Sequence, residues 1–166
     1  MRTLIEQARA VNRRQISAVE LVEAALRQIE VVEDLTNAFT VVLPDDALAR
    51  AKELDASTPI GPLHGVPVAV KDLFDIAGVA TSGGCAAYVD RRASEDSSVV
   101  AKLRGAGAIV IAKTNMHELA FGTTTQVSCF GGVRNPWDLE RIPGGSSGGS
   151  GAADARRGGG RPEEGS

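Results

Sequence analysis

Residues 143–151 constrain this chain more than any other stretch, because they read Pro-Gly-Gly-Ser-Ser-Gly-Gly-Ser-Gly. Five glycines and three serines in nine positions do not suit an ordinary helix or strand, since glycine loses more conformational entropy there than any other residue. Such a run is either a flexible linker or a shaped loop that presents hydroxyl and backbone N–H groups to a reacting atom. The rest of the sequence has to decide between these two interpretations.

Composition describes an ordinary globular chain and excludes several classes of function. The 166 residues are enough for one domain with a core, and 43% of them are hydrophobic. The net charge of −3 and the aromatic content of 4% argue against nucleic-acid binding. The first residues form a charged amphipathic pattern without the apolar segment of a secretory signal, and no apolar run is long enough to span a membrane.

The cysteines and histidines indicate a reducing compartment and no metal site. Cys85 and Cys129 form no Cys-x-x-Cys pair and are interpreted as reduced thiols, which predicts a cytoplasmic location. His64 and His117 lack ligand-like spacing with either cysteine, so no zinc site is expected.

Hydrophobic periodicity predicts helices in the first third of the chain and an α/β arrangement after it. Ser17 and Glu20 form a capping-box pattern, and apolar residues recur at helical spacing after it. Two short apolar runs, 66–70 and 108–112, flank a capped helix for which Gly105 is the expected C′ glycine, and this order predicts a parallel sheet. The expected helices cover 4–12, 18–33, 44–55 and a segment around 99–103, with a short one at 115–121; the expected strands cover 39–43, 66–70 and 108–112; and 122–151 are expected to form a loop.

Lysines follow both apolar runs, Lys71 after the first and Lys113 after the second. The carboxyl ends of strands are where ligands usually bind in α/β sheets. Burial lowers the pKa of a lysine, and a neutral lysine can take a proton from a serine hydroxyl, as Ser–Lys pairs do without histidine. By composition and spacing alone, however, a linker at 143–151 and a surface lysine at 71 are the favoured interpretations.

Four motifs, in one order along the chain, resemble those of the amidase signature family. They are GPLHGVPVAVKD at 61–72, AKTNM at 112–116, RNPWD at 134–138 and PGGSSGGSGAA at 143–153. The pattern is most similar to the A subunits of glutamyl/aspartyl-tRNA amidotransferases and to their bacterial amidase relatives. Four ordered motifs argue against an unrelated α/β domain with a Gly/Ser linker.

The resemblance implies an α/β fold, the N-terminal portion of a mixed sheet flanked by helices. It also implies hydrolysis of an amide C–N bond, or transfer of the released ammonia, by a Lys–Ser–Ser triad that uses no metal and no cofactor. Lys71 matches the family's lysine, and Ser146 matches the bridging serine, which follows a cis peptide bond and relays a proton. Ser147 is expected to support the loop by hydrogen bonding, and the candidates for substrate binding are Thr123, Thr124, Thr125 and Ser147.

The implied partners are a small-molecule amide substrate and, for an amidotransferase, further subunits. Neither nucleic acid nor a membrane is expected to be bound directly, in keeping with the charge and hydropathy patterns.

The sequence departs from the family where the triad should be completed. The family's nucleophilic serine lies in a downstream D-T-G-G-S segment that also supplies oxyanion donors, and no segment after Ser146 matches it. Residues 1–153 are therefore expected to be the N-terminal part of an amidase domain, incomplete and with open sheet edges and apolar faces. Without the nucleophile and the oxyanion donors, the chain is expected to be inactive alone.

Residues 154–166 are polar and rich in glycine without helical periodicity, so they are expected to be disordered and unrelated to the family. Their bias toward Ala, Arg, Gly and Pro suggests a shifted reading frame. Sequencing the locus tests this hypothesis, and it is wrong if no other frame restores an apolar helix and D-T-G-G-S. The alternative functions are a non-enzymatic truncated or frameshifted fragment and a segment completed by a partner chain.

Overall fold

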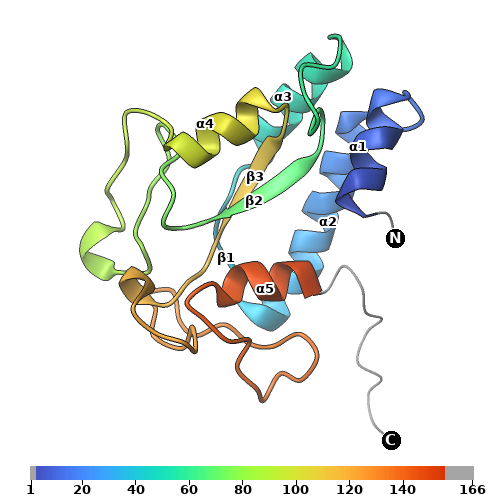
Figure 1. Cartoon of the computed structure of the whole chain (residues 1–166). Coiled ribbons are helices and arrows are strands. Elements are labelled where there is room, and N and C mark those ends of the chain that lie inside the picture. The colour runs from blue at the N-terminus through green and yellow to red at the C-terminus, as the bar shows by residue number, and fades with distance from the viewer. Residues whose placement is uncertain (1–2, 156–166) are drawn as a thin grey trace, which may run out of the picture.

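The computed structural model describes residues 3–155, which form a small mixed sheet with helices packed on both faces (Figure 1). The helices are α1 (Leu4–Asn12), α2 (Ala18–Thr36), α3 (Pro44–Asp55), α4 (Ser98–Gly105) and α5 (Gly148–Ala155), the strands are β1 (Phe39–Val42), β2 (Pro67–Lys71) and β3 (Ile109–Thr114), and two short 3₁₀ turns are η1 (Ala86–Tyr88) and η2 (Glu118–Ala120).

The first two helices begin at capping boxes. At α2 the Ser17 hydroxyl accepts a hydrogen bond from the Glu20 amide at 3.0 Å, and the Glu20 carboxylate accepts one from the Ser17 amide at 2.8 Å. α1 starts in the same way at Thr3 and Glu6. The capping box predicted at Ser17 is confirmed, and it satisfies N–H groups that have no partner inside the helix.

The sheet has the strand order β1-β3-β2, and it is mixed. β2 pairs with β3 in parallel, from Pro67 opposite Ile109 to Lys71 opposite Thr114, while β1 pairs with β3 antiparallel. All six residues of β3 are buried, as expected for a strand that has neighbours on both sides. The predicted parallel pair and the mixed α/β sheet are both confirmed.

Alternate residues of β3 build two separate cores, one on each face of the sheet. Ile109 and Ile111 pack with residues of α2, α3 and α5. Val110 packs instead with Val70 of β2 and Val100 of α4. α4 therefore covers one face, and α2, α3 and α5 cover the other, so that α4 lies above the strands and α5 below them in Figure 1.

Two predicted boundaries around α4 and β3 are wrong. Gly105 is the last helical residue rather than the C′ glycine, and the positive φ of 91° falls on Gly107. A Cβ at Gly107 would lie 2.7 Å from the Cα of His64, so glycine is needed there by tertiary contact as well as by conformation. β3 also continues to Thr114, which places Lys113 inside the strand instead of after it.

The prediction of a loop over 122–151 is wrong at its end, because α5 begins at Gly148, inside the Gly/Ser run. The reason is packing. Gly148 and Gly149 are buried, and a Cβ at Gly149 would lie 2.3 Å from the carbonyl oxygen of Asn115, so only glycine lets α5 approach the end of β3 this closely. Between 115 and 121, where a short helix was predicted, there is only the three-residue turn η2.

α5 also contains Asp154 and Ala155, the first two residues of the segment predicted to be disordered. The remainder of that segment, 156–166, lies outside the described residues. Across residues 3–155, no helix combines the length and the apolar character needed to cross a membrane.

Candidate active site

The fold brings Lys71 and Ser146 into direct contact, although they lie 75 positions apart in the sequence. Lys71 is the last residue of β2, and its Nζ donates a hydrogen bond of 2.6 Å to the Oγ of Ser146. Ser146 lies two residues before α5, and the peptide bond between Gly145 and Ser146 is cis. The lysine at the carboxyl end of a strand and the serine of the Gly/Ser run thus share one site.

Partial burial lowers the pKa of Lys71 below its ordinary value of 10.5. Burial removes water from the ammonium, which disfavours the charged form of the side chain. A larger fraction of Lys71 is therefore neutral at a given pH, and a neutral amine 2.6 Å from a hydroxyl can accept its proton.

Hydrogen bonds from the His117 amide and from the Thr125 side chain hold the backbone of the loop that carries Ser146. The carbonyl oxygen of Ser146 accepts a hydrogen bond of 3.0 Å from the amide of His117. The Thr125 hydroxyl donates to the Gly144 carbonyl at 2.8 Å and accepts from the Gly148 amide at 3.0 Å. Thr125 thereby links the residues on both sides of Ser146, and its own side chain is fully buried.

The glycines of the loop are required because the chain segments approach so closely. A Cβ at Gly145 would lie 2.7 Å from the Thr125 hydroxyl, and one at Gly148 would lie 2.5 Å from it. Real Cβ atoms do not make such contacts, so a larger side chain at either position would push the loop away from Thr125.

The other candidates for substrate binding lie beside this loop in different environments. Thr123 and Ser147 are exposed, whereas Thr124 is half-buried with its hydroxyl 3.4 Å from Nδ1 of His117. Thr125 is buried, and its hydroxyl is already occupied by Gly144 and Gly148.

A second lysine forms a buried polar cluster next to the site. Lys113, which has no exposed side-chain surface, lies 2.6 Å from the carboxylate of Asp72 and donates to the Thr81 hydroxyl at 2.6 Å and to the Ala80 carbonyl at 2.8 Å. The other carboxylate oxygen of Asp72 accepts hydrogen bonds from the amide and hydroxyl of Ser82. Burial lowers the pKa of Lys113, and the neighbouring carboxylate opposes that change.

Sequence reasoning did not identify this cluster, although one signal was present. Asp72 directly follows Lys71, and Lys113 directly follows an apolar run that is fully buried in the fold. A charged side chain in such a strand requires a partner of opposite charge. The partner itself could not be found, because Asp72 and Lys113 meet only when β2 and β3 pair.

The described residues form neither a group of metal ligands nor a disulfide. Within residues 3–155, His, Cys, Asp and Glu side chains do not gather in groups of three or more that could hold a metal ion. Cys85 and Cys129 are both free.

Comparison with known proteins finds relatives from a single family that match most of the chain. The family model described as Amidase matches residues 20–159. The A subunit of the glutamyl-tRNA(Gln) amidotransferase of Salinispora tropica is 48% identical over 152 residues, which are 89% of this chain and 31% of that protein.

Solved structures agree with this result. One solved structure comes from a vestigial protein complex that reveals the evolutionary origins of an s-triazine catabolic enzyme. It is 39% identical to this chain with a TM-score of 0.87, and the match covers 92% of this chain and 34% of that one. Another, a crystal structure of an amidase, is 37% identical with a TM-score of 0.85 and covers 93% of this chain and 36% of that one.

This chain spans about a third of the length of the curated relatives it matches. Its fold, its four motifs and the match over residues 20–159 agree, and the chain therefore belongs to the amidase family.

Proposed function

We propose that Lys71 and Ser146 form the proton-relay half of a centre that cleaves amide C–N bonds. The observation that carries this proposal is the 2.6 Å contact between the Nζ of Lys71 and the Oγ of Ser146. The lowered pKa of Lys71 supports it, because a general base must be neutral at the working pH.

In this mechanism a neutral Lys71 accepts the proton of the Ser146 hydroxyl. Ser146 in turn accepts a proton from a second, nucleophilic serine, whose oxygen attacks the amide carbonyl. When the C–N bond breaks, the proton returns through Ser146 to the leaving nitrogen, which departs as ammonia or an amine. Lys71 ends neutral, so the relay is ready for the hydrolysis of the acyl-enzyme.

The nucleophile is the missing half of this centre. The D-T-G-G-S segment that the resemblance implies is not found in the 166 residues, while the matched relatives are about three times as long as the region that they share with this chain. We therefore propose that the chain alone does not hydrolyse amides and becomes active only when the remainder of an amidase domain is present.

The substrate class we propose is a small carboxamide whose nitrogen is released as ammonia. The similarity to the A subunit of an amidotransferase supports this class and, with it, further amidotransferase subunits as partners. Simple hydrolysis is the second candidate, supported by the likeness to the solved amidase structure.

We assign different roles to the four substrate-binding candidates. Thr123 and Ser147 are exposed beside the loop, and Thr124 is half-buried there, so these three remain proposed substrate contacts. The hydroxyl of Thr125 is engaged by Gly144 and Gly148, so in this proposal Thr125 positions the loop that carries Ser146.

A chimera tests the proposed chemistry. Residues 1–155 of this chain are fused to the part of the Salinispora tropica protein that follows the aligned region, and ammonia released from glutamine and asparagine is measured. We expect release by the chimera and none above background by this chain alone. Lys71→Ala and Ser146→Ala should each lower kcat/KM by about 10²- to 10⁴-fold, the range for general acid–base groups.

The matched controls are Lys102→Ala and Ser94→Ala, which remove an exposed lysine and an exposed serine of the same chain. Both should leave kcat/KM within about twofold. The mechanism is wrong if the chimera is active and Lys71→Ala retains that activity, and the proposed inactivity is wrong if the unfused chain releases ammonia in a Lys71-dependent way.

A further inference from the structure

The two cysteines, Cys85 and Cys129, come from separate segments of the chain that pack against each other. The amide of Cys129 donates a hydrogen bond of 2.8 Å to the carbonyl oxygen of Gly84, the residue directly before Cys85. Figure 1 shows η1, which begins after Cys85, beside η2 and the orange loop that follows it. The fold therefore brings together two thiols that have no motif in common along the sequence.

This hydrogen bond limits the distance between the two Cα atoms. By standard peptide dimensions, the Cα of Cys85 lies about 2.8 Å from the Gly84 oxygen, and the Cα of Cys129 lies about 1.5 Å from its own nitrogen. With the hydrogen bond of 2.8 Å between them, the Cα atoms are at most about 7 Å apart. The path also bends at the nitrogen, which makes the distance shorter. Disulfides join Cα atoms about 4.4–6.8 Å apart, so the backbone is compatible with one.

Packing on both segments fixes this close approach. The Cys85 amide donates to the Ser82 carbonyl at 3.2 Å, which closes a turn around Gly84. A Cβ at Gly84 would lie 3.3 Å from the hydroxyl oxygen of Ser128, tighter than ordinary contact. Gly84 and Ser128 directly precede the two cysteines, so the cysteines are held near each other by the packing of their neighbours.

Both thiols are accessible, and their surroundings make them slow nucleophiles at neutral pH. Cys129 is exposed and Cys85 is half-buried. A hydrogen bond with Glu118 raises the pKa of the Cys85 thiol, and partial burial raises the pKa of the Cys129 thiol. Because the thiolate is the form that attacks a disulfide, both cysteines should react faster as the pH rises.

We propose that Cys85 and Cys129 form a thiol-oxidation site, which a small disulfide such as oxidised glutathione converts into an intramolecular disulfide. The thiolate of one cysteine attacks the small disulfide and displaces one small thiolate, which leaves a mixed disulfide on the chain. The thiolate of the other cysteine attacks the protein sulfur of that mixed disulfide and displaces the second. The protein loses two electrons and two protons, and the small disulfide becomes two thiols.

The new bond connects two segments that lie next to the candidate active site. The first contains Ser82, whose amide and hydroxyl donate to the carboxylate of Asp72. The second contains Thr125, which holds the residues on both sides of Ser146. The disulfide therefore limits how far these segments can move apart. The proposal rests on the contact of the two segments, and not on the proposed chemistry of Lys71 and Ser146.

The test exposes the full chain to buffers with increasing ratios of oxidised to reduced glutathione. Intact mass and peptide mapping identify the products. We expect a product about 2 Da lighter than the reduced chain, with the peptides that contain Cys85 and Cys129 linked. In concentrated urea, half oxidation should need a ratio at least about tenfold more oxidising, because the unfolded chain does not hold the thiols together. The rate in the folded chain should rise from about pH 7 to about pH 9.

The matched control keeps two accessible thiols but moves one of them. Cys129→Ser combined with Ile60→Cys places the second thiol at a 48% exposed position before β2, whereas Cys85 follows β2. This variant should gain a glutathione on each cysteine and form no internal disulfide. Cys85→Ser alone should carry one glutathione, at Cys129.

Four outcomes overturn the proposal. The first is a folded chain that carries a glutathione on each cysteine in place of the internal disulfide. The second is a dimer linked through Cys129 as the main product. The third is half oxidation at the same glutathione ratio with and without urea. The fourth concerns the connection of the segments: oxidation should slow amide hydrogen exchange in 122–133, and unchanged exchange there contradicts it.

Discussion

Lys71 and Lys113 lie on two paired strands, yet their environments give them different properties. Lys113 is enclosed and held by the carboxylate of Asp72, whereas the hydrogen bond of Lys71 goes to a serine hydroxyl. Burial lowers the pKa of both lysines, but at Lys113 the carboxylate of Asp72 opposes this effect and favours the charged form. Lys71 contacts a hydroxyl instead, and this arrangement is the one that suits a base.

Substituting Lys113 should destabilise the fold strongly. Lys113→Met leaves the buried carboxylate of Asp72 without its cation, which typically costs about 3–5 kcal/mol in the free energy of unfolding. Denaturation by urea measures the loss. The double variant Lys113→Met, Asp72→Asn should recover part of it, and Lys102→Met, at an exposed position, should have little effect. Equal losses in the single and double variants would contradict the ion pair as the cause.

The protonation of Lys71 should follow its lowered pKa. Acylation of Lys71 by an amine-directed reagent, followed by mass spectrometry, should rise with pH through a midpoint below 10.5. Because the folded chain then binds this proton less tightly than the unfolded chain, Lys71 makes the free energy of unfolding increase with pH between the lowered pKa and 10.5. A midpoint at or above 10.5 would contradict the assignment of Lys71 as a base.

Among the elements, α5 shows most clearly how packing overrides intrinsic preference. Four of its eight residues are Gly148, Gly149, Ser150 and Gly151, which are poor helix formers. The helix forms because its first turn fits against Asn115, Ala38 and Thr125, where a side chain would not fit. The glycines that made 143–151 look like a loop are thus the residues that allow a helix at that position.

Alanine substitutions at two glycines of α5 should change the free energy of unfolding in opposite directions. At Gly149 a Cβ would lie 2.3 Å from the Asn115 carbonyl and 2.5 Å from the Ala38 carbonyl, so Gly149→Ala should destabilise the chain by about 1–3 kcal/mol or more. At Gly151 a Cβ meets no atom within 4 Å, so Gly151→Ala should stabilise it by about 0.5–1 kcal/mol. Urea denaturation of both variants is the measurement, and similar effects at the two positions would contradict the packing of α5 on β3.

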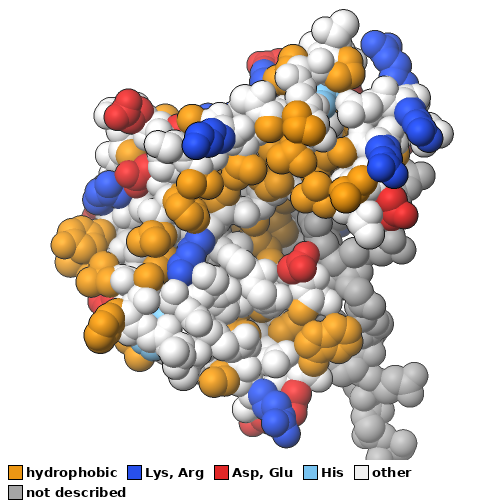
Figure 2. All heavy atoms as spheres, viewed as in Figure 1, with side chains coloured by type: hydrophobic (Ala, Val, Ile, Leu, Met, Phe, Trp, Pro, Cys, Tyr) orange, Lys and Arg blue, Asp and Glu red, His pale blue; other side chains and the backbone are white. Residues whose placement is uncertain are grey.

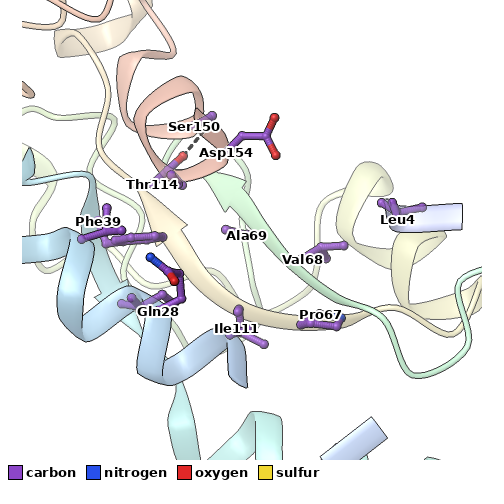
Figure 3. Close-up of a pocket in the computed structure, with 14 residues that line it drawn as sticks. Leu4, Gln28, Phe39, Pro67, Val68, Ala69, Ile111, Thr114, Ser150 and Asp154 are labelled. Atoms are coloured by element: carbon purple, nitrogen blue, oxygen red, sulfur yellow. Dashed lines mark hydrogen bonds between the residues drawn. The ribbon is translucent and has the colours of Figure 1, made fainter. Parts of the chain in front are cut away.

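In the described part of the chain, the sheet is enclosed at its central strand β3 and has β1 and β2 as its two edges. β3 has strands on both sides and helices over both faces, whereas β2 has β3 as its single neighbouring strand among the described residues, and an apolar groove lined by residues of all three strands, α1, α2 and α5 opens over one face of the sheet (Figure 2 and Figure 3). The arrangement explains how a chain a third as long as its relatives can contain a core and still expose an apolar surface.

Hydrogen exchange across the isolated chain should reflect this arrangement. Amides of β3 should exchange most slowly, through unfolding of the whole domain, and amides at the free edge of β2 should exchange faster through local opening. Mass spectrometry or NMR of the full chain can rank the three strands. Protection in β2 equal to that in β3 would mean that the edge is already covered in the isolated chain.

The sequence by itself determined the local structure and the family. The capping box at Ser17, the helix from Pro44 to Asp55 and the apolar strands that carry Lys71 and Lys113 follow from side-chain periodicity and caps, which act over a few residues. The four motifs indicated an amidase-type mixed sheet, which the family match and the fold confirm.

Only the tertiary structure decided which of these residues meet. The resemblance placed Lys71 and Ser146 in one triad, but the 2.6 Å distance between them, the pairing of Lys113 with Asp72 and the start of α5 at Gly148 depend on segments that lie far apart in the sequence. The strand order β1-β3-β2, which puts Lys113 between two neighbouring strands, also depends on such contacts. Such contacts leave no local pattern, because their energy comes from burial and close approach that exist only when the strands and helices are packed together.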